Sequence, residues 1–138
     1  MKYAAIIGIN PSKGARSPIL WNRAFKYFDY EIRMKPIDVK EDKINDLFEK
    51  LNRDKNFIGG AIAFPYKEII AKLLGNNLTK EAKKIGAVNC LYRNKDNQIF
   101  GTNTDGEAAV QSYENNFGLI GKKKILIIGL GGAGKAVS

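Results

Sequence analysis

The 138-residue chain has 44% hydrophobic residues, 27% charged residues and a formal net charge of +9, a composition typical of a soluble globular protein with one core of ordinary size. It has no histidine and one cysteine, Cys90, which excludes an internal disulfide, a cysteine-based metal cluster and a histidine-dependent nucleophile. No apolar run approaches the roughly 20 residues that span a membrane, and none near the N-terminus fits a signal peptide. We therefore expect a cytoplasmic protein with no membrane partner and no metal.

The positive charge favours an anionic partner, which could be a nucleic acid, a phosphorylated cofactor or a carboxylate substrate. Lysines are interspersed with acidic residues in the segment KEDKINDLFEKLNRDK, and no basic stretch is interleaved with aromatic residues as on RNA-binding surfaces. We interpret most of this charge as a solvated surface and expect no nucleic-acid partner. A steep salt dependence of DNA binding would argue for one.

Strand-type runs alternate with helical periods along the chain. Short apolar or alternating runs predict strands over residues 3–9, 30–39, 57–64, 87–93 and 98–102. Apolar residues three and four positions apart, or a capping residue, predict helices over residues 18–27, 41–52, 66–74, 79–85 and 105–117. Pro65 ends the third strand because it has no N–H to donate, and Thr79 can cap the helix that follows it. The polar turn at 94–97 makes the last two strands a hairpin.

This alternation predicts an α/β domain with a mostly parallel sheet flanked by helices, to which the hairpin adds antiparallel strands. A further strand is predicted over 123–128, followed by a Gly-rich turn over 129–134 and the beginning of a helix. A strand, a Gly-rich turn and a helix N-terminus form the first part of a Rossmann dinucleotide-binding unit. We expect a substrate-binding and catalytic domain over 1–117, then a hinge and the truncated start of a Rossmann domain over 118–138.

Polar side chains occur where predicted strands end, among them Ser17, Lys67, Asn89 and Asp105. Ligands of open α/β sheets bind outside the carboxyl ends of the strands, so these loops should converge. Lys67 and Asp105 could form a proton-transfer pair for an alcohol or a ketone while a cofactor carries the hydride.

Each of these residues also has a structural interpretation. Ser17 precedes Pro18 and can cap the helix that begins there, and Thr104 or Asp105 can cap the helix over 105–117. Lys67 is one of 23 lysines and arginines, most of which must be solvated surface residues. Its place directly after an apolar strand and a proline distinguishes it from the others. Both interpretations stay open at this point.

Five segments, in this order, resemble the N-terminal part of the shikimate dehydrogenases, the NADP-linked enzymes that reduce 3-dehydroshikimate. They are residues 8–22, 65–67, 85–89, 101–105 and 129–136. The resemblance implies an NADP-dependent oxidoreductase of aromatic amino acid biosynthesis, with NAD as the alternative cofactor. It also implies a small cyclic hydroxy or keto acid as the partner, and it leaves a homodimer open.

The resemblance implies roles for individual residues. Lys67 and Asp105 would be the catalytic pair, Asn89 would bind a ring hydroxyl and Ser17 would bind the substrate carboxylate. Five residues of the Gly-rich turn would face the NADP pyrophosphate: Gly129, Gly131, Gly132, Ala133 and Gly134. The residues that read the 2′-phosphate would lie beyond Ser138, so we expect this chain to be inactive alone.

Several positions depart from the family pattern. The family usually has serine, asparagine and threonine where this chain has Ala15, Ala61 and Ala63, and histidine and threonine where it has Trp21 and Cys90. The three alanines remove side-chain hydrogen-bond partners, each worth about 1 kcal/mol or more. They suggest either a divergent enzyme with a less polar ring substrate or a non-catalytic ligand-binding or regulatory relative. The retained Lys67 and Asp105 favour the enzyme.

Overall fold

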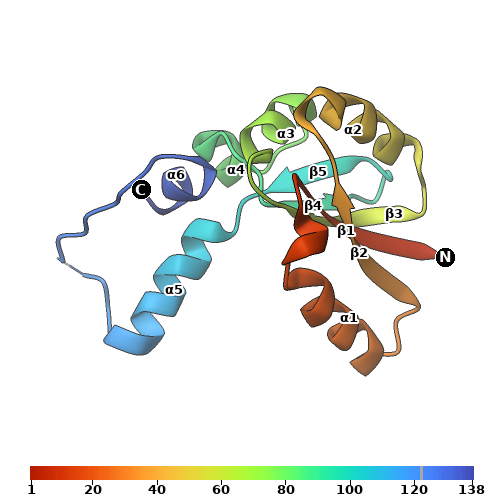
Figure 1. Ribbon diagram of the computed structural model, residues 1–138. Helices are drawn as coiled ribbons and strands as arrows, with labels where there is room; N and C mark the ends of the chain where they lie inside the picture. Colours follow the sequence, from red (N-terminus) through yellow and green to blue (C-terminus); the bar gives the residue numbers. More distant parts are fainter. Residues whose placement is uncertain (122) are drawn as a thin grey trace.

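Five strands form one mixed sheet in the order β2–β1–β3–β4–β5 in the computed structural model, which describes residues 1–121 and 123–138 (Figure 1). β1 (Lys2–Gly8), β2 (Ile32–Asp38) and β3 (Phe57–Ile62) are parallel, whereas β4 (Cys90–Arg93) and β5 (Ile99–Thr102) form an antiparallel hairpin beside β3. This arrangement confirms the predicted mostly parallel α/β fold.

The helices cover the sheet unequally. They are α1 (Ser17–Tyr27), α2 (Ile44–Arg53), α3 (Lys67–Leu74), α4 (Lys80–Ile85), α5 (Asp105–Phe117) and α6 (Gly132–Val137), with 3₁₀ turns η1 (Pro11–Lys13) and η2 (Glu41–Lys43). In Figure 1, α2, α3 and α4 lie on one side of the sheet and α1 lies on the other. Helix α5 leads away from the sheet, and the chain then returns so that α6 packs beside α4 and α5. None of the helices in the described residues is long and apolar enough to cross a membrane.

The main core lies between the sheet and the three helices on its more covered side. Its largest fully buried side chains are Phe57, Tyr66, Ile70, Val88, Ile7 and Ile99. A second, smaller cluster of Ala4, Ile6 and Met34 lies on the other face, packed against Phe25 of α1. Successive residues of β1 thus point into opposite clusters, as expected for a central strand buried on both faces.

Strand β3 approaches both of its neighbours closely because it carries two consecutive glycines. Gly59 and Gly60 have positive φ angles of 138° and 151°. An ideal Cβ on Gly59 would lie 2.2 Å from the carbonyl oxygen of Leu91, and one on Gly60 would lie 1.8 Å from that of Ala5. Only glycine adopts this backbone without strain, so the centre of the sheet depends on these two residues.

Arg93, at the end of β4, ties the hairpin to the parallel part of the sheet. Its guanidinium donates hydrogen bonds to five backbone carbonyl oxygens, those of Leu51, Asn52, Asp54, Phe57 and Asn97. Three of these carbonyls lie at the C-terminal end of α2, where helix carbonyls lack partners within the helix and favour a cation.

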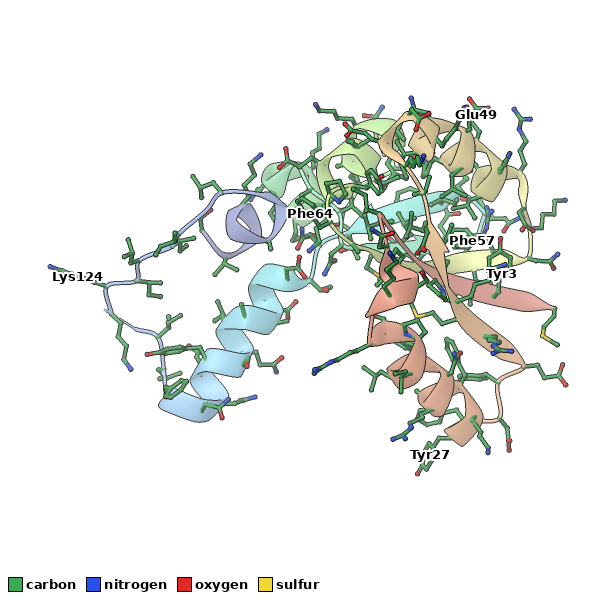
Figure 2. The ribbon with its side chains drawn as sticks, viewed as in Figure 1. Tyr3, Tyr27, Glu49, Phe57, Phe64 and Lys124 are labelled. Carbon is green, nitrogen blue, oxygen red and sulfur yellow. The ribbon has the colours of Figure 1, made fainter. Side chains whose placement is uncertain are left out.

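Next to this end of α2, Tyr3 packs against Phe57 with ring centroids 5.7 Å apart (Figure 2). The Tyr3 hydroxyl donates to the Asp54 carboxylate at 2.8 Å. Burial, together with this hydrogen bond, raises the pKa of Tyr3 to about 12. The same hydrogen bond lowers the pKa of Asp54.

The structure corrects two boundaries. The strand expected over 87–93 begins only at Cys90, because the buried Ala87 and Val88 pack into the core instead of pairing in the ladder. The strand expected over 123–128 is not formed, whereas the Gly-rich turn and the helix after it are. A strand needs a neighbour that satisfies its backbone groups, and residues 123–128 pair with no strand of the part of the chain that the structure describes.

Candidate active site

Lys67 and Asp105 form a partly buried ion pair at the carboxyl end of β3. Lys67 is the first residue of α3, and Asp105 is the first residue of α5. The Lys67 Nζ atom donates to Asp105 Oδ2 at 2.6 Å, and the two side chains are only 20% and 27% exposed. The structure therefore brings together the two residues that the sequence suggested as a proton-transfer pair, although they lie 38 positions apart.

Asn89 holds the other oxygen of the Asp105 carboxylate. Its Nδ2 atom donates to Asp105 Oδ1 at 2.7 Å and to Thr104 Oγ1 at 3.0 Å, while its Oδ1 atom accepts from the Thr104 backbone N–H at 3.0 Å. Each carboxylate oxygen of Asp105 thus has its own donor, which fixes the orientation of the group. Lys67, Asn89 and Asp105 form one connected set, as the strand-end argument predicted.

Asn103 stabilises this set through hydrogen bonds with the backbone of Asp105 and Ala87. The sequence placed it in the segment 101–105 but gave it no role of its own. Asn103 is buried, with only 7% of its surface exposed. Its Oδ1 atom accepts from the Asp105 N–H at 3.0 Å, and its Nδ2 atom donates to the Ala87 carbonyl at 3.1 Å. The capping role expected of Thr104 or Asp105 is therefore filled by the side chains of Asn89 and Asn103. An asparagine two residues before a predicted helix is the signal that could have identified it.

The backbone beside Lys67 is fixed by buried neighbours. The Val88 N–H donates to the Lys67 carbonyl at 2.9 Å, which joins the start of α3 to the loop that carries Asn89. Tyr66 is fully buried and its hydroxyl donates to the Val39 carbonyl at 2.7 Å. Burial raises the pKa of Tyr66. The Lys67 side chain therefore extends from a rigid position.

The Gly-rich turn lies against this site. A pocket of about 520 Å³ is lined by Lys67, by residues 62–65 and by glycines of the turn over 129–134. A Cβ on Gly132 would lie 3.0 Å from the Lys67 Cβ, and a Cβ on Gly134 would lie 2.0 Å from the Gly129 carbonyl oxygen. Gly129 has a φ of +95°, which favours glycine. The glycines of the turn thus present backbone without side chains to the pocket that Lys67 also lines.

An ion pair and a close backbone contact hold α6 in this position. Lys135 Nζ lies 3.1 Å from Glu68 Oε2 on α3. A Cβ on Gly106 of α5 would lie 1.9 Å from the Ala136 carbonyl oxygen, so only a glycine lets the two helices approach this closely.

The first loop, residues 9–16 between β1 and α1, lines a second pocket next to the first. This pocket, of about 360 Å³, is lined by residues 8–11, Ala15, Ala63 and Phe64. Ala63 and Phe64 line both pockets, so the two are neighbours that meet at the turn of residues 64–66, the Phe64 turn. Phe64 is 81% exposed and lies between the sheet and the Gly-rich segment in Figure 2.

Ser17 is not part of the connected set around Lys67. It is the first residue of α1, and the N-cap position belongs to Arg16, which makes no side-chain capping bond. Among the hydrogen bonds of the described residues, none involves the Ser17 hydroxyl, so the capping interpretation is wrong for this residue.

All three alanines that depart from the family pattern pack on one face of the sheet. Ala15, Ala61 and Ala63 contact the small cluster of Ala4, Ile6 and Met34. Ala61 pairs with Cys90 across β3 and β4, and burial raises the pKa of the Cys90 thiol. Of the three, Ala15 and Ala63 line the second pocket, and their side chains offer it no hydrogen-bond partner.

Comparison with known proteins gives a consistent result. The family model of the shikimate dehydrogenase substrate binding domain matches residues 6–91. Shikimate dehydrogenase (NADP(+)) of Carboxydothermus hydrogenoformans is 34% identical over 137 residues, which are 99% of this chain and 48% of that protein. The chain spans about half the length of the curated relatives it matches.

Two solved structures have the same fold over nearly the whole chain. A shikimate dehydrogenase in complex with NADP+ superposes with a TM-score of 0.90 at 31% identity, covering 99% of this chain and 46% of that one. The shikimate 5-dehydrogenase of Listeria monocytogenes in complex with shikimate and NAD gives 0.86 at 26% identity, covering 99% and 46%.

Proposed function

The chain belongs to the shikimate dehydrogenase family, and we propose that it is the substrate-binding half of an NADP-dependent oxidoreductase that reduces a cyclic keto acid, 3-dehydroshikimate or a relative of it. The observation that carries this proposal is the Lys67–Asp105 pair, in which Asn89 orients Asp105 and Lys67 lines one pocket together with the Gly-rich turn. We assign residues 1–117 to the substrate domain and 118–138 to the hinge and the start of the cofactor domain.

The chemistry of Lys67 follows from its position. A ketone that is reduced becomes an alkoxide, which needs a proton as the charge develops. The Lys67 ammonium can bind the carbonyl oxygen and supply that proton, and in the oxidation direction the neutral amine can accept it from the alcohol. Asp105 stabilises the ammonium through the 2.6 Å contact and holds it in place. Asn89 keeps Asp105 oriented and has the amide chemistry to bind a ring hydroxyl.

The cofactor would be NADP, with NAD as the alternative, and it would supply the hydride. Gly129, Gly131, Gly132 and Gly134, with Ala133, would bind its pyrophosphate. The bare backbone of this turn, which a side chain at Gly134 would obstruct, fits such a group. In the substrate domain, Ser17 at the beginning of α1 would bind the substrate carboxylate.

The substrate is proposed to be less polar than shikimate on the side that faces the first loop. Ala15 and Ala63 line the second pocket, and together with Ala61 they are packed in an apolar cluster. A second candidate function, a non-catalytic ligand-binding or regulatory relative, is favoured by the same three alanines. Turnover of NADPH with a panel of cyclic keto acids by the full-length protein distinguishes the two, because only the enzyme consumes the cofactor.

Restoring the polar groups should improve binding of shikimate. In the full-length protein we expect a high KM for shikimate. The triple change Ala15→Ser, Ala61→Asn and Ala63→Thr should lower this KM at least about tenfold. That corresponds to about 1.4 kcal/mol of binding free energy from three new hydrogen bonds. Binding groups that act equally in the ground and transition states change KM more than kcat. Steady-state kinetics with shikimate and NADP measure the effect.

The matched control keeps the added volume without the polarity. Ala61→Leu with Ala63→Val fills similar space in the apolar cluster but offers no hydrogen bond, so it should leave KM unchanged or raise it. An ordinary low KM in the wild type, or an unchanged KM in the triple variant, would show that other groups compensate for the alanines.

The 138-residue chain should bind NADP weakly or not at all. The Gly-rich turn offers backbone N–H groups, but the strand before it is not formed, and one turn with a short helix buries little of a dinucleotide. Isothermal titration calorimetry of the chain with NADP should give no saturable heat at micromolar concentrations. Micromolar affinity would mean that the turn and α3 together suffice for the cofactor.

A further inference from the structure

The carboxylate of Asp38, on the edge strand β2, binds the middle of the first loop. Asp38 is the last residue of β2 and pairs in register with Gly8, the residue where β1 ends and the loop begins. Asp38 Oδ1 accepts a hydrogen bond from the Ser12 backbone N–H at 2.9 Å, and Oδ2 accepts one from the Ser12 hydroxyl. Both oxygens of the carboxylate are thus used on one residue of the loop.

The rest of the loop is held mainly by itself. Its backbone hydrogen bonds run from Lys13 to Asn10 and from Ala15 to Pro11, which closes the turn η1 on itself. Among the hydrogen bonds of the described residues, those from Ser12 to Asp38 are the ones that join residues 9–15 to another element. Pro11 is buried, and Ala15 packs against the small cluster of Ala4, Ile6 and Met34, so the loop also has apolar contacts with the sheet. Asp38 supplies the polar attachment of the loop to the sheet.

We propose that Asp38 is a positioning residue for substrate binding: through Ser12 it holds the first loop against the Phe64 turn and so sets the width of the pocket that Ala15 and Ala63 line. This inference rests on the proposed function, because that function makes the loop part of the substrate site. The loop also leads directly into α1, whose first residue is Ser17. A loop released from Asp38 moves Ala15 and Ser17 together.

The catalytic set does not share this anchor. Lys67, Asp105 and Asn89 are held by α3, α5 and Asn103, with no hydrogen bond to residues 9–15 among the described residues. Loss of the Asp38 anchor should therefore weaken substrate binding and leave the proton-transfer step intact. This separation predicts a change in KM without a matching change in kcat.

Proteolysis tests the anchor without reference to catalysis. The loop carries two trypsin sites, Lys13 and Arg16, and native-state cleavage requires local opening of the chain. In the 138-residue chain, Asp38→Ala should speed the first cut at these sites by about fivefold or more, roughly the effect of losing a charge-assisted hydrogen bond. Ser12→Ala should have a smaller effect in the same direction, because the backbone N–H of residue 12 still donates to Asp38. The double variant should be no faster than Asp38→Ala, because the hydroxyl bond lost in Ser12→Ala is itself a bond to Asp38.

Two further variants complete the proteolysis experiment. Asp38→Asn keeps an acceptor and an amide for Ser12 and should restore most of the protection. Glu49→Ala removes an exposed carboxylate of α2 whose ion-pair partner among the described residues is Arg53 (Figure 2), so it should leave cleavage unchanged. Mass spectrometry of the first fragments locates the cuts. Unchanged cleavage at Lys13 and Arg16 in Asp38→Ala overturns the proposal.

Kinetics of the full-length protein test the consequence for substrate. Asp38→Ala should raise KM for the keto acid about fivefold or more and leave kcat and the KM for NADPH within about twofold, with recovery in Asp38→Asn. A loss in kcat equal to or larger than the change in KM overturns the positioning role. If the wild type turns over no cyclic keto acid, the proposed function fails, whereas the proteolysis result still decides whether Asp38 anchors the loop.

Discussion

Replacing Lys67 by alanine should lower kcat of the full-length enzyme by about 10²–10⁴-fold, the usual contribution of general acid–base catalysis. The KM for the keto acid should change little, because proton transfer matters mainly in the transition state. The fold should survive, since Asp105 keeps its hydrogen bonds from Asn89 and from its own N–H to Asn103. Steady-state kinetics at saturating NADPH, with circular dichroism as the check on folding, measure the effect.

Lys72→Ala is the matched control for this variant. Lys72 lies on the same helix, α3, and is exposed, so its removal should leave kcat unchanged. If Lys67→Ala raises KM but retains kcat, Lys67 binds the substrate without transferring a proton, and the assignment of the catalytic pair would have to be withdrawn.

Replacing Gly60 by alanine should destabilise the domain by about 3 kcal/mol or more, which places it among the large single-residue effects. The new Cβ would lie 1.8 Å from the Ala5 carbonyl oxygen, and the positive φ of 151° adds backbone strain. The strands β1 and β3 would have to separate at the centre of the sheet. Urea unfolding of the 138-residue chain, followed by far-ultraviolet circular dichroism, gives the free energy of unfolding.

Gly131→Ala is the control for the glycine prediction. Nothing lies within 4 Å of its ideal Cβ, and its φ of −72° and ψ of −175° are extended backbone that alanine adopts freely. Its effect should stay within about 0.5 kcal/mol. Equal stability of the two variants would mean that β1 and β3 have room for a side chain at Gly60.

Most of the fold was predictable because it depends on local pattern. Apolar periods located β1, β2, β3 and the main helices to within a few residues, and the strand-end rule predicted that Lys67, Asn89 and Asp105 would meet. A pair that shifts each other's pKa needs its two charges within about 4–6 Å. The structure has a direct contact of 2.6 Å, which periodicity alone does not specify.

What the sequence did not predict depends on contacts between distant segments. Whether residues 123–128 form a strand depends on a neighbouring strand, not on their own apolar character. The pairing of Ser12 with Asp38 and the support of Asp105 by Asn103 are side-chain contacts that no local pattern encodes. The roles of Ser17 and of the Gly-rich turn remain predictions.

The five hydrogen bonds of Arg93 have a consequence for how this domain can vary in evolution. Each acceptor is a main-chain carbonyl oxygen, so the side chains at Leu51, Asn52 and the other acceptor positions do not contribute to the contact. A change of side chain at an acceptor position therefore leaves this contact in place, although Leu51 and Phe57 are also constrained as core residues. Position 93 itself has no such freedom, because a lysine concentrates its donors at one point and lacks the planar fork that serves carbonyls from α2, β3 and the hairpin turn together. The identity of residue 93 therefore maintains the connection between the parallel strands and the hairpin.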